Sequence, residues 1–292
     1  MQLATSTNIY FNRPNGKKGA LEDCIRFCGE GGFRRMDLSF LDYVNFGFPI
    51  VTDHYLDWIN RIHALADSYG IIFSQAHAPF YNFCDTNVPD RDFKDRMVWR
   101  SIECAGRLGV KWIAIHAGTD YDSGWMRKRS FEKNREYFLP LLEYASKCGV
   151  GIAFENLWDY NIAPRRRYTA ISEDLLELVQ SFDCPQAGIC FDIDHAVLSG
   201  LDPVRELDVI APLLRSTHIS DCIDIKADHL LPFDGITNWK PFMQKLNAIG
   251  YQGDLAYEIH RYTQYMPDAL VPSAVARAVT VGNYLLSLAN EL

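Results

Sequence analysis

Short apolar runs and longer amphipathic runs alternate along the entire chain. Eight of the apolar runs have the length and the β-branched content that are typical of buried strands. They span residues 3–9, 34–38, 71–76, 112–116, 152–155, 188–192, 215–219 and 255–259. Because strands that alternate with helices pair in parallel through helical crossovers, this order predicts an α/β fold with a parallel sheet.

The runs between the strands have helical periodicity. In 53–69, for example, Leu56, Ile59 and Ile62 recur at a spacing close to the helical repeat. Further helices are expected at 93–108, 129–148, 172–182, 202–214, 239–249 and 272–289. A glycine, the residue expected at a left-handed helix end, separates helix from strand at Gly70, Gly109, Gly149 and Gly250.

Eight strand–helix units in 292 residues match one closed barrel, since such barrels take about 250 residues. We therefore expect a single (β/α)8 TIM-barrel domain over residues 1–292. An open, doubly wound sheet is the alternative, but it gives no reason for polar residues to follow so many strands. The long connections after the strands, at 80–89, 120–129, 157–169 and 221–238, would build the active-site end of a barrel.

Composition limits the partners and the location. The formal net charge of −8 and the pI near 5.5 argue against a nucleic-acid surface, which is usually basic. The first ten residues lack the pattern of a signal peptide, and we expect no apolar run long enough to span a bilayer. Eight cysteines without a zinc-like Cys-x-x-Cys pair indicate reduced thiols in a cytoplasmic protein. Homo-oligomerisation stays open.

An acid or a histidine stands where each of the last four predicted strands ends: Glu155, Asp192, His218 and Glu258. They lie roughly 25 to 40 residues apart, one strand–helix unit per step. Any one of them could be an isolated residue that a helix N-terminus or an arginine satisfies. Together at one mouth, three carboxylates and an imidazole would repel one another without a cation. The set predicts one divalent metal, for which oxygen-rich ligands favour Mn, Mg or Co, with Zn also compatible.

Further polar and aromatic residues follow the predicted strands. Each of the histidines His77, His116, His195 and His229 could be a hydrogen-bonded structural residue, and a second metal near His77 and His116 stays open. Our interpretation is that these histidines contact substrate hydroxyls. Trp158, which comes soon after the strand at 152–155, is the aromatic expected to form a wall against a sugar face.

Arg165, Arg166 and Arg167 follow one another in the loop after the fifth strand. As a phosphate clamp, they would make the substrate a sugar phosphate. As an exposed loop, they would carry no function. Because short charge runs are usually solvated, we expect the second outcome.

These motifs together resemble the xylose-isomerase-like TIM-barrel superfamily of sugar isomerases and epimerases, which also contains the endonuclease IV nucleases. The resemblance covers essentially the whole chain. It rests on the order and spacing of Ala76-His77-Ala78-Pro79, Ile115-His116-Ala117-Gly118, Phe154-Glu155-Asn156, Asp192-x-x-His195, His218-Ile219-Ser220-Asp221, the loop from Asp228-His229-Leu230 to Asp234-Gly235, and Glu258. It implies a divalent metal held by the four strand-end residues, with the two glutamates acting on opposite faces of a bound keto sugar.

The chain departs from two members of that superfamily. Ketose 3-epimerases usually carry an arginine six residues after the metal histidine, and here that residue is Asp224. Endonuclease IV has an Asp-x-His pair for its third zinc, whereas Ala227 stands two residues before His229 here, with Asp228 adjacent. The second departure, together with the acidic charge, counts against a nuclease.

The strand-end residues suit proton transfer next to a carbonyl. A metal bridging the carbonyl and a neighbouring hydroxyl stabilises an enediolate, while one carboxylate removes a proton and an opposing acid returns it. Glu155 and Glu258 are the predicted catalytic pair of a metal-dependent sugar isomerase or epimerase. The alternative is a dehydratase or lyase acting on a keto-sugar or inosose. A non-catalytic sugar-binding barrel and an endonuclease IV-like nuclease rank lower. The expected substrate is a sugar or polyol-derived ketone, with no nucleic-acid or membrane partner.

Overall fold

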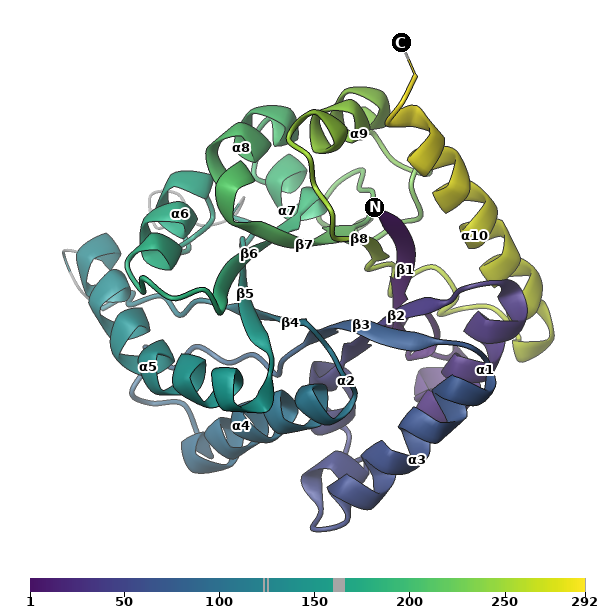
Figure 1. The fold of residues 1–292 in the computed structure, drawn as a ribbon, viewed down its shortest axis with the longest axis horizontal. Coiled ribbons are helices and arrows are strands. Elements are labelled where there is room, and N and C mark those ends of the chain that lie inside the picture. The colour runs from purple at the N-terminus through teal and green to yellow at the C-terminus, as the bar shows by residue number, and fades with distance from the viewer. Residues whose placement is uncertain (123, 125, 160–165, 292) are drawn as a thin grey trace.

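A computed structural model describes residues 1–122, 124, 126–159 and 166–291. Within them, eight parallel strands close into a barrel in chain order, and β1 pairs with β8 (Figure 1). The strands are β1 Gln2–Ser6, β2 Arg35–Ser39, β3 Ile72–His77, β4 Trp112–His116, β5 Gly151–Glu155, β6 Ala187–Asp192, β7 Leu214–Ile219 and β8 Asp254–Tyr257. The predicted (β/α)8 barrel is confirmed.

The helices form a ring outside the strands (Figure 1). They are α1 Leu21–Gly31, α2 Phe40–Asn45, α3 Tyr55–Ser68, α4 Arg91–Arg107, α5 Met126–Cys148, α6 Ser172–Gln180, α7 Ile193–Leu198, α8 Pro203–Ile210, α9 Trp239–Ala248 and α10 Val271–Leu288. Short 3-10 turns are η1 Thr7–Tyr10, η2 Pro14–Gly16, η3 Pro49–Val51, η4 Ala211–Leu213 and η5 Asp268–Leu270. All four glycines expected at helix ends have positive φ, between 64° and 73°.

Most predicted boundaries differ from the observed ones by one to four residues, and the largest difference is at the end of the helix expected at 202–214. The strand expected at 3–9 ends at Ser6, because the Ser6 hydroxyl accepts a hydrogen bond from the Asn8 backbone and starts η1. The helix expected at 202–214 ends at Ile210, since Pro212 has no N–H to continue it. The strand expected at 255–259 ends at Tyr257, which leaves Glu258 as the first residue beyond the sheet.

The inward-facing side chains change from small to polar toward the C-terminal ends of the strands. Ala114, Ala153 and Cys190 form a small buried cluster inside β4, β5 and β6, and Trp112 packs against it. Because side chains alternate between the two faces of a strand, the next inward positions lie two residues further along. Those positions are His116, Glu155 and Asp192. The small side chains therefore fill the interior of the barrel, and the acidic residues and the histidine lie above them at the mouth.

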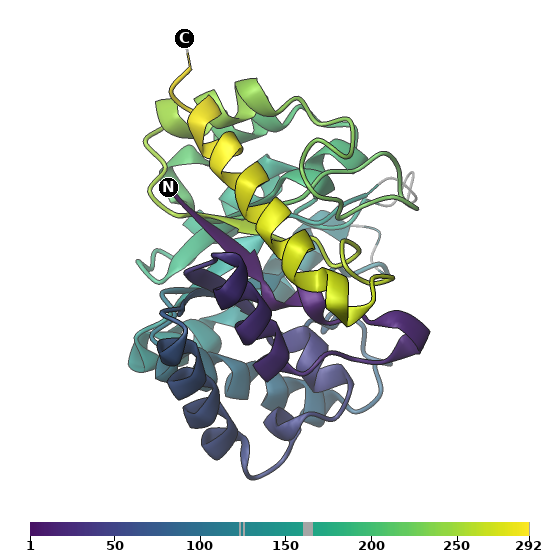
Figure 2. The same cartoon turned by 90° about the vertical axis from the view of Figure 1, so that its right-hand side faces the viewer.

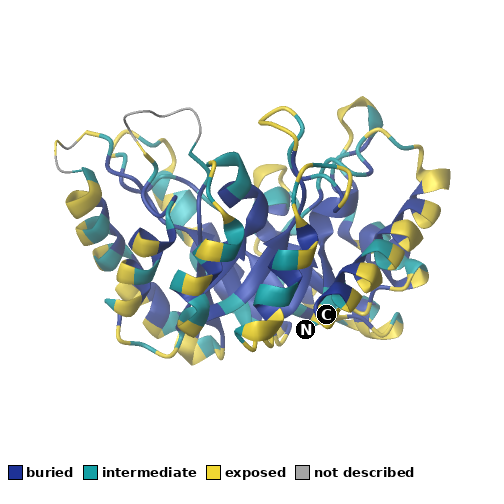
Figure 3. Cartoon of the chain, turned by 90° about the horizontal axis from the view of Figure 1, so that it is seen from above, coloured by how far each residue is buried: buried dark blue, intermediate teal, exposed yellow. Residues whose placement is uncertain are grey.

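The mouth is formed by the longer connections. In Figure 3 they stand above the buried strands at one end of the barrel and carry most of the irregular backbone. The connection between β7 and α9 runs from Ser220 to Asn238, and the one between β3 and α4 runs from Ala78 to Asp90. The connections at the opposite end are short, and five of them contain a glycine with positive φ: Gly32, Gly70, Gly109, Gly149 and Gly250.

One helical segment has the length and composition of a membrane span, although Asp268 and Arg277 interrupt its apolar residues. By length and composition alone, the 21 residues of Asp268–Leu288 could cross a bilayer. In the structure this segment is η5 and α10, and α10 packs along β1, α1 and α9 (Figure 2). Its buried residues recur at helical spacing: Val271, Ala274, Val275, Ala278, Gly282, Leu285 and Leu288. That pattern is typical of a helix covering a barrel.

Candidate functional site

Four donors from consecutive strands converge at the mouth. Glu155 ends β5, Asp192 ends β6, His218 lies near the end of β7, and Glu258 follows β8. One ligand atom from each of them lies within 4.8 Å of the others. Glu155, Asp192 and His218 are almost fully buried, whereas the Glu258 side chain is 16% exposed. The predicted set is therefore assembled, with its open side toward the mouth.

The two nitrogens of His218 face different partners. Nε2 lies 2.9 Å from Asp37 Oδ2, and an ionised carboxylate only accepts, so Nε2 carries a proton and donates it. Nδ1 faces the mouth, 2.8 Å from Glu155 Oε1 and 3.1 Å from Glu258 Oε2. Nδ1 is thus the nitrogen that a cation could use, and the carboxylate behind Nε2 orients the ring.

Protons balance the charges of this cluster. Burial alone would lower the pKa of His218, but Cys190 and Glu155 beside it raise that pKa well above its ordinary value. Burial would likewise raise the pKa of Glu155, but His218 and His116 hold it well below its usual range. Burial, opposed in part by His195, raises the pKa of Asp192 to about 6. The protonated imidazole of His218 therefore balances the negative charge of the carboxylates in this cluster. A bound divalent cation would balance the same charge.

Asn156 braces the ends of β5 and β6. Its side-chain Nδ2 donates to the Asp192 carbonyl at 2.9 Å, and its Oδ1 accepts from the Asp192 amide at 2.7 Å. The Asn156 carbonyl lies 2.8 Å from His195 Nδ1. Asp192 Oδ1 also accepts from the His195 amide, whereas Asp192 Oδ2 is buried and makes no hydrogen bond with any described residue. The brace leaves this one oxygen free to bind something else.

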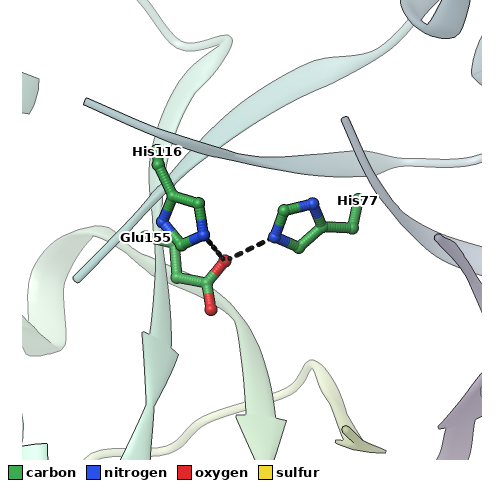
Figure 4. A group of neighbouring side chains, drawn as sticks. All are labelled: His77, His116 and Glu155. Carbon is green, nitrogen blue, oxygen red and sulfur yellow. Dashed lines mark ion pairs between the residues drawn. The ribbon is translucent and has the colours of Figure 1, made fainter. Parts of the chain in front are cut away.

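His77 and His116 flank Glu155 (Figure 4). His77 Nε2 lies 3.1 Å and His116 Nε2 lies 3.6 Å from the same oxygen, Glu155 Oε2. Burial would lower the pKa of His77, but Glu155 raises it to about 9. Burial lowers the pKa of His116 to about 3, against the opposing effect of Glu155. His77 is thus charged and His116 neutral beside one carboxylate, and the three residues form a second group whose ligand atoms lie within 4.8 Å of one another.

His195 and His229 lie on the side of the mouth nearest Asp192, and donor atoms of these three residues lie within 4.8 Å of one another. The ring centroids of His195 and His229 are 5.9 Å apart, and both side chains are buried. All four histidines selected from the sequence therefore lie beside the carboxylates of this polar cluster.

Trp158, Arg166 and Arg167 lie together in the loop after β5. Arg165 lies outside the described residues. The Arg167 guanidinium stacks over the Trp158 ring at 3.9 Å, and Arg166 Nε lies 3.6 Å from Asp159 Oδ2. Arg166 and Arg167 thus have partners within their own loop.

Comparison with known proteins identifies the family. Residues 26–278 match the family model of the xylose isomerase-like TIM barrel. The chain belongs to this family. It is 28% identical over 213 residues to Uncharacterized protein MJ1311 of Methanocaldococcus jannaschii, a match that covers 70% of this chain and 71% of that one.

Solved structures share the fold over the whole chain. A D-tagatose 3-epimerase-like protein is 20% identical with a TM-score of 0.76, and the match covers 99% of this chain and 98% of the other. The IOLI protein, in a structure with a binding zinc atom, is 16% identical with a TM-score of 0.78 and full coverage of both chains.

Two buried residues behind the site are absent from the set selected by sequence. Asp37, on β2, accepts from His218, and Gln75, on β3, donates through Nε2 to the same Asp37 oxygen at 2.7 Å. The signal for Asp37 was an acid between two apolar residues, Met36 and Leu38, near the end of a predicted strand. It could not be assigned a role, because its partner lies 181 residues away in sequence.

Replacing Asp37 with asparagine is expected to weaken metal binding by about 10- to 100-fold, the usual effect of altering a residue that orients a metal-ligating histidine. The neutral amide would no longer favour the Nε2 proton that leaves Nδ1 free. Titration of metal-free protein with Mn²⁺ measures the affinity. Asp208→Asn, which removes an exposed charge paired with Lys245, is the control. Equal affinity in both variants would show that Asp37 only fills space.

A second group missed by sequence lies at the rim. The His260 ring stacks on His229 with centroids 4.0 Å apart, and Arg261 forms an ion pair with Asp228. Asp224, where ketose 3-epimerases of this family carry arginine, is exposed and accepts from the Lys226 amide in its own turn. Arg261 is therefore a guanidinium that reaches this side of the mouth from β8.

The long loop between β7 and α9 folds around the Asp221 carboxylate. Oδ1 accepts from the backbone of Cys222 at 2.9 Å and Thr237 at 3.0 Å. Oδ2 accepts from the backbone of Phe233 at 2.9 Å and from Trp239 Nε1 at 3.1 Å. The loop therefore returns to its own first residues, which places His229 over the mouth.

Asp221→Asn is expected to lower the free energy of unfolding by about 2–4 kcal/mol. Each carboxylate oxygen of Asp221 accepts from two N–H groups. Whichever oxygen the asparagine NH₂ replaces, it would face two N–H donors, and both of those hydrogen bonds would be lost. Thermal unfolding and limited proteolysis between Cys222 and Asn238 are the measurements, with Asp208→Asn again as the control. Unchanged melting and protection from the protease would show that the loop does not depend on this carboxylate.

Proposed function

We propose that this protein is a divalent-metal-dependent isomerase or epimerase acting on a sugar or a polyol-derived ketone. The observation that carries the proposal is the convergence of Glu155, Asp192, His218 and Glu258 within 4.8 Å from four consecutive strands. Structural similarity to a D-tagatose 3-epimerase-like protein supports the substrate class.

The donor set fits a hard or borderline cation. Asp192 Oδ2 is buried without a hydrogen-bond partner in the part of the chain that the structure describes, and His218 Nδ1 faces two carboxylates. A buried carboxylate oxygen left unpaired is costly, and a cation at this position would satisfy it. Three carboxylates and one imidazole favour Mn, Mg or Co, and the zinc atom in the structure of the IOLI protein supports a divalent ion of some kind.

The two glutamates are placed to move protons on either side of one carbon. Glu155 comes from β5 and Glu258 from the end of β8, and both reach His218 from different directions. A bound divalent cation would supply stabilisation of the negative charge that develops on the carbonyl oxygen. One glutamate takes the proton from the carbon beside the carbonyl, and the other returns a proton to that carbon or to its neighbour.

The histidines and Trp158 would hold the sugar. We assign His77, His116, His195 and His229 to contacts with substrate hydroxyls and Trp158 to one face of the ring. Arg166 and Arg167 bind within their own loop, which supports a substrate without a phosphate group at that position.

A dehydratase or lyase acting on a keto-sugar or inosose is the second candidate. The observation that favours it is that His77 and His229 both have a raised pKa of about 9. Burial would lower each pKa, but Glu155 raises that of His77 and Asp228 raises that of His229. Either imidazolium could protonate a departing hydroxyl after a glutamate has removed the neighbouring proton.

Incubation with a panel of ketoses and inososes in deuterated water tests the proposal. Metal-loaded protein should introduce solvent deuterium at a carbon beside the carbonyl and yield an isomer or epimer. Loss of water from the substrate would select the second candidate instead. No exchange with any substrate, together with nicking of a plasmid that contains abasic sites, would contradict both and assign the site to a nuclease.

A further inference from the structure

A cavity of about 360 Å³ opens at the N-terminal end of the barrel, opposite the mouth. Its walls come from the first residues of β2, β4, β7 and β8 and from the interior of β3. The residues that matter are Arg35, Ser74, Lys111, Arg215, Ser216 and Asp254. Its volume falls within the usual range of small-molecule sites, about 300–1,000 Å³.

The cavity is positively charged in an acidic protein. Arg35, Lys111 and Arg215 line it against one carboxylate, Asp254, whereas the whole chain has a formal net charge of −8. Arg35 Nε donates to Asp254 Oδ2 at 2.7 Å, and the described residues offer no partner to its two terminal nitrogens. Arg215 uses Nη1 for backbone carbonyls, and no described residue pairs with the Lys111 ammonium. Unused donors on three cations therefore surround one space.

Two hydroxyls in the same wall are also unused. Ser74 Oγ and Ser216 Oγ are buried, and neither has a hydrogen-bond partner among the described residues. Ser216 is only 2% exposed, so bulk water does not compensate for the missing bond. Guanidinium groups and hydroxyls around a cavity are the donors that bind phosphate oxygens.

We propose that this cavity binds the phosphate group of a small molecule. The ligand is a phosphate dianion, which Arg35, Lys111 and Arg215 would neutralise and to which Ser74 and Ser216 would donate. Because the cavity exceeds the size of one phosphate, the rest of a small phosphorylated metabolite would fit beside Trp112. The site is separate from the proposed catalytic metal position and does not depend on the proposed reaction.

The cavity nevertheless lies directly behind the mouth. Gln75 lines it and donates to Asp37, which accepts from the metal-side histidine His218. Variants used to test the cavity must therefore avoid this chain of hydrogen bonds. Lys111 and Ser216 meet that condition, since neither takes part in the hydrogen bonds that join Gln75, Asp37 and His218.

Calorimetric titration of the metal-loaded protein, after removal of unbound metal, tests the proposal. The probes are inorganic phosphate, glucose 6-phosphate and glucose. Wild-type protein should bind both phosphates at this site, and Lys111→Ser and Ser216→Ala should each weaken that binding by about tenfold. Lys226→Ser, which removes an exposed lysine at the opposite end, is the matched control and should bind as wild type.

The melting temperature separates binding from folding. Ser216→Ala removes a hydroxyl without a partner, so the ligand-free melting temperature should be unchanged, while the rise caused by phosphate should shrink. Tighter binding of glucose 6-phosphate than of inorganic phosphate identifies a metabolite as the ligand, and the reverse identifies free phosphate. Absence of phosphate binding, or equal affinity in all three variants, overturns the proposal.

Discussion

Glu258→Gln is expected to lower turnover by about two to four orders of magnitude, the usual contribution of a positioned acid or base. Glutamine keeps the size of the side chain and one oxygen, which can turn toward the donor set at the cost of the bond that Asn8 Nδ2 donates to Glu258 Oε1 at 3.2 Å, so the fold and part of the metal affinity should remain. Glu155→Gln should lower turnover to the same degree. The measurements are steady-state rates, bound metal and solvent deuterium exchange for each variant.

Glu103→Gln is the matched control, because Glu103 also accepts a hydrogen bond, from the Tyr55 hydroxyl, but lies far from the mouth. If epimerisation uses two bases, one of the site variants should still exchange deuterium into one stereoisomer without forming product. A variant that keeps its metal and near-normal turnover would show that its glutamate is only a ligand. Normal exchange and turnover in both would refute the two-carboxylate mechanism.

Removal of the metal by EDTA is expected to abolish activity and to lower the melting temperature. A cation present at 100 times its dissociation constant stabilises the folded protein by about 2.7 kcal/mol, so chelation should remove a stabilisation of that order. Re-addition of Mn²⁺, Mg²⁺, Co²⁺ or Zn²⁺, one at a time, should restore both properties to different degrees. The number of metal ions bound per chain shows whether a second ion binds beside His77 and His116 in addition to the first.

His218→Ala should make the melting temperature insensitive to metal, because Nδ1 is lost from the centre of the donor set. His54→Ala is the control, since that histidine is exposed on the outside of the barrel, with an 84% exposed side chain. Full activity after chelation, with no metal found by elemental analysis, would contradict the metal proposal.

The barrel and the strand-end residues were predictable because both depend on local sequence. Apolar runs predicted all eight strands, and β4 was predicted with its observed bounds. Strand alternation then places Glu155 and Asp192 inward above Ala153 and Cys190, without any knowledge of distant contacts. The positions that depend only on the two-residue alternation of a strand could thus be predicted from the sequence.

The residues that support the site could not be predicted, because their partners are distant in sequence. Asp37 lies where the pairing of β2 with β3 shifts register, between Met36 and Asp37, and alternation does not anticipate such a shift. Arg261 meets Asp228 across 33 residues and two connections. The sequence placed the histidines at strand ends, but their closeness to Glu155 depends on the width and tilt of the closed barrel.

The loop gathered around Asp221 has a consequence for how this family diversifies. Its anchor and all four donors to it lie within residues 221–239, so the segment depends on few bonds to the rest of the barrel for its shape. Gly235 packs so closely on the carboxylate that an added Cβ would lie 2.3 Å from Oδ1. Recombination that exchanges this stretch whole would transfer the anchor together with its four donors, while the exposed residues 223–226 between the anchor points remain free to vary. Substrate preference could then change in one genetic step, without disturbing the strands that carry the chemistry.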